Sequence, residues 1–156
     1  MICKICNQNN FIQLNEYYTI CSNCNAVFYN GVERIEHDYK SNYFIEKDDG
    51  WLYRNERILK FLNRAIKFSI IQQYENILDF GSGTGFLVDT FRKYNFNAYG
   101  YEPFAIPLYS KENIINSKFE KFVYDYKNYF DVIFAIEVIE HLDDPIEILG
   151  KLLTTL

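Results

Sequence analysis

With 156 residues, the chain has room for one substantial domain and a small module, and its 49% hydrophobic and 24% charged residues are ordinary for a globular protein. The net charge of −5, without a block of like charges, argues against a broad basic surface for nucleic acid or an acidic membrane. No apolar stretch is long enough to span a bilayer and the first residues lack the order of a signal peptide, so the sequence predicts a cytoplasmic protein.

Four cysteines form the first pattern along the chain. Two C-x2-C pairs are separated by fourteen residues, and they comprise Cys3, Cys6, Cys21 and Cys24. This is close to the spacing of a four-thiolate zinc site. Two disulfides would require export, and a redox-active thiol pair would require a thioredoxin-like pattern; the sequence shows neither signal. We therefore predict one structural Zn²⁺, because four cysteines leave no open position for a catalytic water.

Short strand patterns surround the two cysteine pairs. Asn7 and Asn25 follow the pairs, and asparagine is one of the few residue types that tolerates the left-handed conformation such tight knuckles often need. Strands are predicted at 11–14, 17–20 and 26–29. Residues 1–30 are thus expected to form a zinc ribbon, whose core is so small that the metal would supply much of its folding free energy.

An aperiodic, aromatic-rich segment joins the ribbon to the rest of the chain. We interpret residues 31–53 as a linker whose aromatic side chains pack the ribbon against the second domain, with a part in an acceptor pocket as the alternative. Apolar residues at i, i+4 and i+7 then predict a helix over 54–71. The second domain, 54–156, begins with this helix.

The stretch from Ile77 to Phe91 carries the clearest chemical signal. An apolar strand breaks at a run of alternate glycines and continues directly into an amphipathic helix; these glycines are Gly81, Gly83 and Gly85. Glycine lets a ligand come close to the backbone, and the N–H groups that open the helix give the ligand a polar rim. This pattern predicts a nucleotide cradle.

The following strand distinguishes between nucleotide cofactors. It ends in Glu102, where a βαβ nucleotide site places the carboxylate that accepts the ribose hydroxyls. A nicotinamide fingerprint would have its third glycine at Phe86, whereas this turn reads D-x-G-x-G-x-G from Asp79, which disfavours a dinucleotide. The alternative is an ordinary glycine turn in which Glu102 is a solvated strand end.

Strands and helices alternate over the second domain. Strands are predicted at 76–80, 98–102, 113–116 and 132–136, and helices at 86–94, 106–112 and 145–153. This alternation predicts an α/β fold with a doubly wound, mostly parallel, Rossmann-like sheet.

Over about 76–153 these motifs resemble the class I S-adenosylmethionine-dependent methyltransferases. DFGSGTG is similar to the first motif of that family, YEP to its acidic second motif, and FDVIFAIEVIEHLDDP to its fourth strand and the following loop. The resemblance implies that S-adenosylmethionine is the cofactor and that it is bound by Asp79, Gly81, Ser82, Gly83, Gly85, Glu102, Pro103 and Phe104. The position after the third strand, where the family commonly has an acid for the adenine, departs from the pattern and holds Lys118 or Phe119.

The same resemblance points to the loop after the fourth strand for catalysis. Methyl transfer requires an acceptor held in line with the methyl group and, for a hydroxyl, a group that removes a proton. Candidates for that group are Glu137, Glu140 and His141, with a loop-capping role for the histidine as the alternative. The E-x-x-E-H pattern also resembles half of the metal site of small-RNA 2′-O-methyltransferases and some quinone O-methyltransferases.

The order of ribbon, linker, helix and glycine motif resembles a bacterial methyltransferase group in which some members act on nucleotide sugars or polysaccharide precursors. A small-molecule or sugar-type acceptor is therefore expected. The alternatives are a non-catalytic module that binds a cofactor or a partner protein, and an RNA or protein methyltransferase. An RNA enzyme would need basic residues on the ribbon, but Lys4 is the only one before Arg34.

The family resemblance also implies a seven-stranded sheet, of which 132–136 is the fourth and last strand predicted here. We expect a truncated or split methyltransferase domain without its C-terminal strands. Its open sheet edge would favour self-association or a completing partner chain, and turnover would be low or absent.

Overall fold

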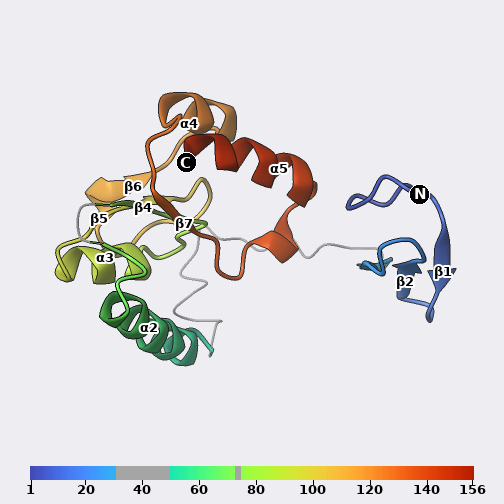
Figure 1. The fold of residues 1–156 in the computed structure, drawn as a ribbon, viewed down its shortest axis with the longest axis horizontal. Coiled ribbons are helices and arrows are strands. Elements are labelled where there is room, and N and C mark those ends of the chain that lie inside the picture. The colour runs from blue at the N-terminus through green and yellow to red at the C-terminus, as the bar shows by residue number, and fades with distance from the viewer. Residues whose placement is uncertain (31–49, 73–74) are drawn as a thin grey trace.

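The structure is a computed structural model that describes residues 1–30, 50–72 and 75–156 (Figure 1). Most of the expected linker, 31–49, lies outside the described residues. The N-terminal unit is an antiparallel sheet with the strand order β1-β2-β3. Its strands are β1 (Phe11–Gln13), β2 (Tyr18–Cys21) and β3 (Val27–Tyr29). Each strand lies within one residue of its prediction.

A side-chain turn connects the first two strands. The Asn15 Oδ1 atom accepts hydrogen bonds from the backbone N–H groups of Tyr17 and Tyr18, at 2.9 and 3.0 Å. Asparagine favours such turns because its short side chain can satisfy backbone donors two and three residues ahead. The resulting reversal sets the antiparallel register, in which Ile12 lies opposite Ile20.

The second domain contains a four-stranded parallel sheet. Its strands are β4 (Asn76–Phe80), β5 (Asn97–Tyr101), β6 (Ile114–Ile115) and β7 (Val132–Phe134), in the order β6-β5-β4-β7. The chain leaves β4 toward β5 and later returns to the opposite side of β4 with β7. Such a reversal of strand order opens a crevice at the carboxyl ends of the strands, which is where ligands bind in open α/β sheets.

Helices cover both faces of this sheet (Figure 1). On one side lie α2 (Trp51–Lys67) and α3 (Phe86–Lys93), and on the other lie α4 (Phe119–Asp125) and α5 (Pro145–Leu152). Alternate residues of β4 enter different cores, because side chains of a strand point to opposite faces. Ile77 belongs to the α2–α3 core, whereas Leu78 and Phe80 belong to the α4–α5 core. The predicted doubly wound α/β fold is confirmed.

One predicted helix is wrong. Residues 106–112 form a loop that ends in a short 3-10 turn, η1 (Lys111–Asn113), and not an α-helix. Pro107 lacks a backbone donor, and the N–H groups of Leu108 and Tyr109 both donate to the distant Thr84 carbonyl, at 2.9 and 3.0 Å. Tertiary hydrogen bonds therefore replace the helical ones.

Other boundaries differ more modestly. The first helix of the domain starts at Trp51 rather than 54 and ends at Lys67 rather than 71, where Ser69 adopts a left-handed conformation with φ 53°. Helix α4 was not predicted, although Phe119 and Phe122 direct a short apolar stripe into the α4–α5 core. Two further 3-10 turns are η2 (Ile139–His141) and η3 (Leu153–Thr155). No helix among the described residues has the length and apolarity needed to cross a membrane.

Candidate cofactor site and metal centre

The glycine loop between β4 and α3 is held by backbone geometry that only glycine adopts easily. Gly81, Gly83 and Gly85 have φ values of 75°, 50° and 80°. Gly85 also permits a close contact, because a Cβ atom there would lie 2.4 Å from the backbone oxygen of Tyr109. The loop is tied to the neighbouring strand by the N–H of Gly81, which donates to the Tyr101 carbonyl at 2.8 Å.

Glu102 lies immediately after β5 and faces the glycine loop. One carboxylate oxygen accepts the N–H of Gly83 at 2.9 Å, and the other accepts the N–H groups of Phe104 and Ala105, each at 2.9 Å. The side chain is buried, with 7% of its surface exposed. These three backbone donors orient the carboxylate beside the glycines, so the alternative of a solvated strand end is wrong. The oxygen that accepts only the Gly83 N–H retains acceptor capacity for a ligand hydroxyl.

Asp79 is a second buried carboxylate at the same edge of the sheet. It is 5% exposed, and its side chain accepts no hydrogen bond within residues 1–30, 50–72 and 75–156. Burial, with the charge of Glu102 as a smaller cause, raises the pKa of the Asp79 carboxyl to about 7. Donor hydrogen bonds or a positive charge from a ligand would therefore stabilise the ionised form of Asp79.

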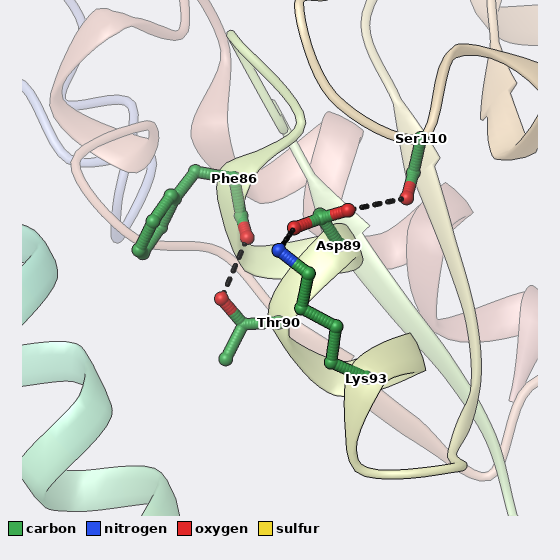
Figure 2. A network of polar contacts seen from close by, with 5 residues as sticks. All are labelled: Phe86, Asp89, Thr90, Lys93 and Ser110. Atoms are coloured by element: carbon green, nitrogen blue, oxygen red, sulfur yellow. Dashed lines mark hydrogen bonds and ion pairs between the residues drawn. The ribbon is translucent and has the colours of Figure 1, made fainter.

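The loop after β5 is fastened to the glycine loop and to α3. Figure 2 shows the Asp89 carboxylate between two partners: it accepts the Ser110 hydroxyl at 3.3 Å and pairs with the Lys93 ammonium at 2.6 Å. The Thr90 hydroxyl donates to the Phe86 carbonyl at 2.9 Å one turn earlier. The Ser110 hydrogen bond holds the loop after β5 against α3, whereas the other two contacts lie within α3. This loop includes Pro103, which is partly buried, and Phe104, which is 66% exposed beside Glu102.

The loop after β7 also reaches the glycine loop. A Cβ atom on Gly81 would lie 2.4 Å from the Cγ2 atom of Val138, so the two loops pack together only because Gly81 lacks a side chain. The three catalytic candidates lie in this loop, and all three are exposed: Glu137, Glu140 and His141. Glu137 has a φ of 56°, which is uncommon for a residue with a side chain and indicates local backbone strain.

Lys118 and Phe119 occupy the position where the family commonly has an acid. Lys118 is the N-terminal capping residue of α4, and the Phe119 ring packs into the α4–α5 core, 5.9 Å from Phe80 and 6.0 Å from Tyr101 between ring centroids. This arrangement explains Phe119 as a core residue. Asn116 lies nearby and donates to the Glu102 carbonyl at 3.1 Å.

Several residues around the site were not found by sequence reasoning. The Gly100 position allows Ser82 to pack on β5, since a Cβ atom at Gly100 would lie 2.5 Å from the Ser82 Oγ atom. That Oγ atom is buried and has no hydrogen-bond partner in the described part of the chain. The sequence signal for this contact was the glycine within the strand NAYGY, because a glycine inside a strand often marks a place where another part of the chain approaches the backbone closely. Thr84, Asp89 and Val138 gave no comparable signal.

The two cysteine pairs form matching knuckles. Asn7 and Asn25 adopt left-handed conformations with φ values of 59° and 61°, as predicted. Their N–H groups donate to the carbonyls of Cys3 and Cys21 at 2.9 and 2.8 Å. This shared geometry turns both pairs toward the same point, and the four sulfur atoms all lie within 4.8 Å of one another.

The sulfur distances suit a metal ion. Cys3 and Cys24 are 3.6 Å apart, as are Cys6 and Cys21, which is too long for a disulfide. A tetrahedral zinc with bonds of about 2.3 Å separates its sulfur ligands by about 3.8 Å. The residues present therefore fit a four-thiolate metal centre.

Backbone hydrogen bonds, burial and neighbouring thiols perturb the pKa values of two of the cysteines. A hydrogen bond from the Gln8 backbone lowers the pKa of Cys6 to about 6. The Ala26 backbone lowers the pKa of Cys24, but burial and the neighbouring thiols raise it more, to about 12. Such opposed shifts are expected where protons are shared among sulfur atoms, and a divalent cation would relieve them by replacing the protons.

Together, the doubly wound sheet, the glycine loop at its reversal point and the oriented carboxylate of Glu102 have the architecture of an α/β protein with a nucleotide-type cradle. The sequence profile of a methyltransferase domain family matches residues 51–156. This match covers more than half of the chain, which therefore belongs to that methyltransferase family. A search of curated proteins gives no match. Family membership supports methyl transfer in general.

Proposed function

We propose that the chain binds S-adenosylmethionine in the cradle between β4 and β5 and transfers its methyl group to a small-molecule or sugar-type acceptor. The observation that carries the proposal is the Glu102 carboxylate, which three backbone N–H groups hold beside the glycine loop. A buried carboxylate in this position is suited to accept a ribose hydroxyl, through the acceptor site that the backbone N–H groups leave open. Membership of a methyltransferase family supports the nature of the group transferred.

The bound cofactor would supply an electrophilic methyl group on a sulfonium centre, and the chain would bind and orient it. The glycine loop admits the ligand close to the backbone, Glu102 accepts a ribose hydroxyl, and Asp79 offers an unpartnered carboxylate to the methionine end. The exposed ring of Phe104 can cover the adenine. Fixing the methyl carbon in place supplies most of the catalytic effect of such a single displacement.

The acceptor would lie over the loop after β7. Val138 packs against Gly81, so this loop borders the cofactor cradle. A hydroxyl acceptor must lose its proton, and Glu137, Glu140 and His141 are exposed and free to take that part. The ribbon, with one lysine and no arginine in residues 1–30, offers little to an RNA acceptor.

We further propose that Cys3, Cys6, Cys21 and Cys24 bind one structural Zn²⁺. The mutual sulfur distances and the paired knuckles support a closed four-thiolate site. Such a site would hold the ribbon together and take no part in methyl transfer.

The cofactor proposal can be tested by isothermal titration of the full chain with S-adenosylmethionine. Replacing Glu102 with alanine should weaken binding roughly 10- to 150-fold, because hydrogen bonds to a charged group contribute about 1.5–3 kcal/mol. Replacing Gly83 with valine should abolish binding, because its side chain would fill the cradle. Glu112→Ala is the matched control: it removes the same charge at an exposed position after the Ser110 turn and should leave affinity unchanged.

The titration also separates the alternatives. Unchanged curves for both Glu102→Ala and Gly83→Val would contradict the placement of the cofactor. Binding of a nicotinamide dinucleotide in place of S-adenosylmethionine would overturn the assignment. A screen of sugar and small-molecule acceptors should then detect methyl transfer at a low rate; tight binding with no turnover on any acceptor would instead identify a non-catalytic module.

Asp79 gives the site a pH dependence. Because its pKa is raised from 3.8 to about 7, the ligand-free protein carries a proton on Asp79 at pH 6 that the unfolded chain does not carry. The contribution of Asp79 to the free energy of unfolding is therefore highest below about pH 4 and falls as the pH rises to 7. A positively charged ligand favours the ionised form, so affinity for S-adenosylmethionine should increase between pH 5.5 and about 7.5.

Titrations and thermal melts across this pH range check both trends. In Asp79→Asn, which cannot ionise, both pH dependences should flatten relative to the wild-type chain. A wild-type affinity that falls as pH rises through 7 would show that Asp79 does not face the positive charge of the cofactor.

A further inference from the structure

One face of the ribbon sheet consists of apolar and tyrosine side chains on all three strands. The register places Ile12 opposite Ile20 and Ile20 opposite Val27, while Tyr18 lies opposite Tyr29. Because alternate residues of a strand share a face, these residues lie on the same side of the sheet. Leu14 continues the face beyond β1, and the Tyr17 ring stacks on Tyr29 with centroids 6.3 Å apart. We call this surface the ribbon face; its members are Ile12, Leu14, Tyr17, Tyr18, Ile20, Val27 and Tyr29.

The opposite side of the sheet already has a structural role. It holds Cys21, which is fully buried, and the rings of Phe11 and Phe28, which pack edge to face at 5.8 Å. This side forms the small core around the cysteine cluster. The ribbon face therefore contributes little to that core.

The ribbon face is exposed within the described residues 1–30, 50–72 and 75–156. The exposed fraction of the residue is 57% for Ile12, 54% for Val27 and 60% for Tyr29, and Leu14, Tyr17 and Tyr18 are also exposed. The ribbon meets the second domain through its first cysteine knuckle, where the Lys4 ammonium donates to the Asp143 carbonyl. A groove of about 460 Å³ between this knuckle and the first turn of α5 marks the same contact. That contact uses none of the residues of the ribbon face.

Charge and area indicate what covers this surface. The only charged residues in 1–30 are Lys4 and Glu16, and neither is part of the ribbon face, so a partner surface with few charged residues at its centre is the best match for it. The same face on a second copy meets this condition. The half-exposed side chains of the ribbon face present roughly 500 Å² of accessible surface on each copy. A symmetric pair would bury roughly 1,000 Å² in total, which is near the lower limit for a specific but weak dimer.

From these observations we infer that the ribbon face is a dimer interface, at which the sheets of two copies pack face to face. The contact is isologous: the aliphatic side chains of Ile12, Ile20 and Val27 meet their counterparts, and the tyrosine hydroxyls reach solvent at the rim. The interface brings two methyltransferase domains into one assembly through their N-terminal modules. It does not depend on the proposed cofactor or acceptor.

Sedimentation of the full, zinc-loaded chain over a range of concentrations tests this interface. The wild-type chain should pass from monomer to dimer as concentration rises. Ile12→Lys should weaken dimerisation about tenfold or more, because each of the two copies then brings one charge into the interface. Ile12→Lys combined with Val27→Lys should weaken dimerisation on the order of 100-fold. Zinc content equal to that of the wild type would show that the ribbon remains folded in these variants.

Gln13→Lys is the matched control. It adds the same charge to the same strand, at an exposed position on the opposite side of the sheet, and should leave dimerisation unchanged. The inference is overturned if the wild-type chain stays monomeric throughout, which would leave the ribbon face to a different protein. It is also overturned if Gln13→Lys disrupts association as strongly as Ile12→Lys, or if association survives the double substitution.

Discussion

Replacing Gly85 with alanine should abolish binding of S-adenosylmethionine and destabilise the second domain by about 2–4 kcal/mol. The new Cβ atom would lie 2.4 Å from the Tyr109 backbone oxygen, and φ at this position is 80°, which alanine rarely adopts. Relief requires movement of the loop after β5, which includes Phe104, or of the glycine loop itself. Thermal or denaturant unfolding measures the loss of stability, and isothermal titration measures the loss of binding.

Gly150→Ala provides the comparison for this variant. Gly150 lies in α5, and a Cβ atom there would meet nothing within 4 Å. Alanine should therefore be neutral or should stabilise the helix by up to about 1 kcal/mol, with unchanged cofactor affinity. If Gly85→Ala behaved like Gly150→Ala, the close approach of the two loops would not be a requirement of the fold.

Removing the metal should unfold the ribbon while the second domain stays folded. A structural zinc contributes on the order of 10 kcal/mol to the folding of a small module, and Cys3 and Cys21 are the only buried residues in 1–30. Hydrogen exchange after treatment with a strong chelator should therefore accelerate in β1, β2 and β3. Exchange in β4 and β5, which are buried within the sheet, serves as the internal control.

The same experiment examines the metal itself. Elemental analysis of protein purified without added metal should give about one zinc per chain, and Cys24→Ser should lower this content. Loss of the ribbon should also abolish dimerisation, because the ribbon face exists only while the three strands are paired. Four freely reactive thiols in a folded, metal-free ribbon would contradict the zinc proposal.

Sequence reasoning failed where distant contacts override local preferences. A helix was predicted at 106–112, but the N–H groups of Leu108 and Tyr109 donate to the Thr84 carbonyl and so take no part in helical hydrogen bonds. Conversely, α4 was too short for its periodicity to stand out, and its position depends on aromatic packing against Phe80 and Tyr101. Both errors concern the part of the chain that connects β5 to β7.

The sequence by itself determined the features whose cause is local. Cysteine spacing and the asparagines after each pair are sufficient for the two knuckles, because turn conformation depends on a few adjacent residues. Likewise, the glycine pattern after an apolar strand predicts the positive φ values of the cradle, and the alternation of strands and helices predicts the parallel sheet.

Only the tertiary structure decided how these parts act on one another. The hydrogen bond of the Gly83 N–H to Glu102, the contact of Val138 with Gly81 and the hydrogen bond of Ser110 to Asp89 join segments separated by up to 57 positions. The open ribbon face likewise depends on which side of a three-stranded sheet the cysteine core occupies. Such contacts depend on how many side chains pack together at once. The spacing of residues within one segment therefore does not reveal which distant segment will contact it.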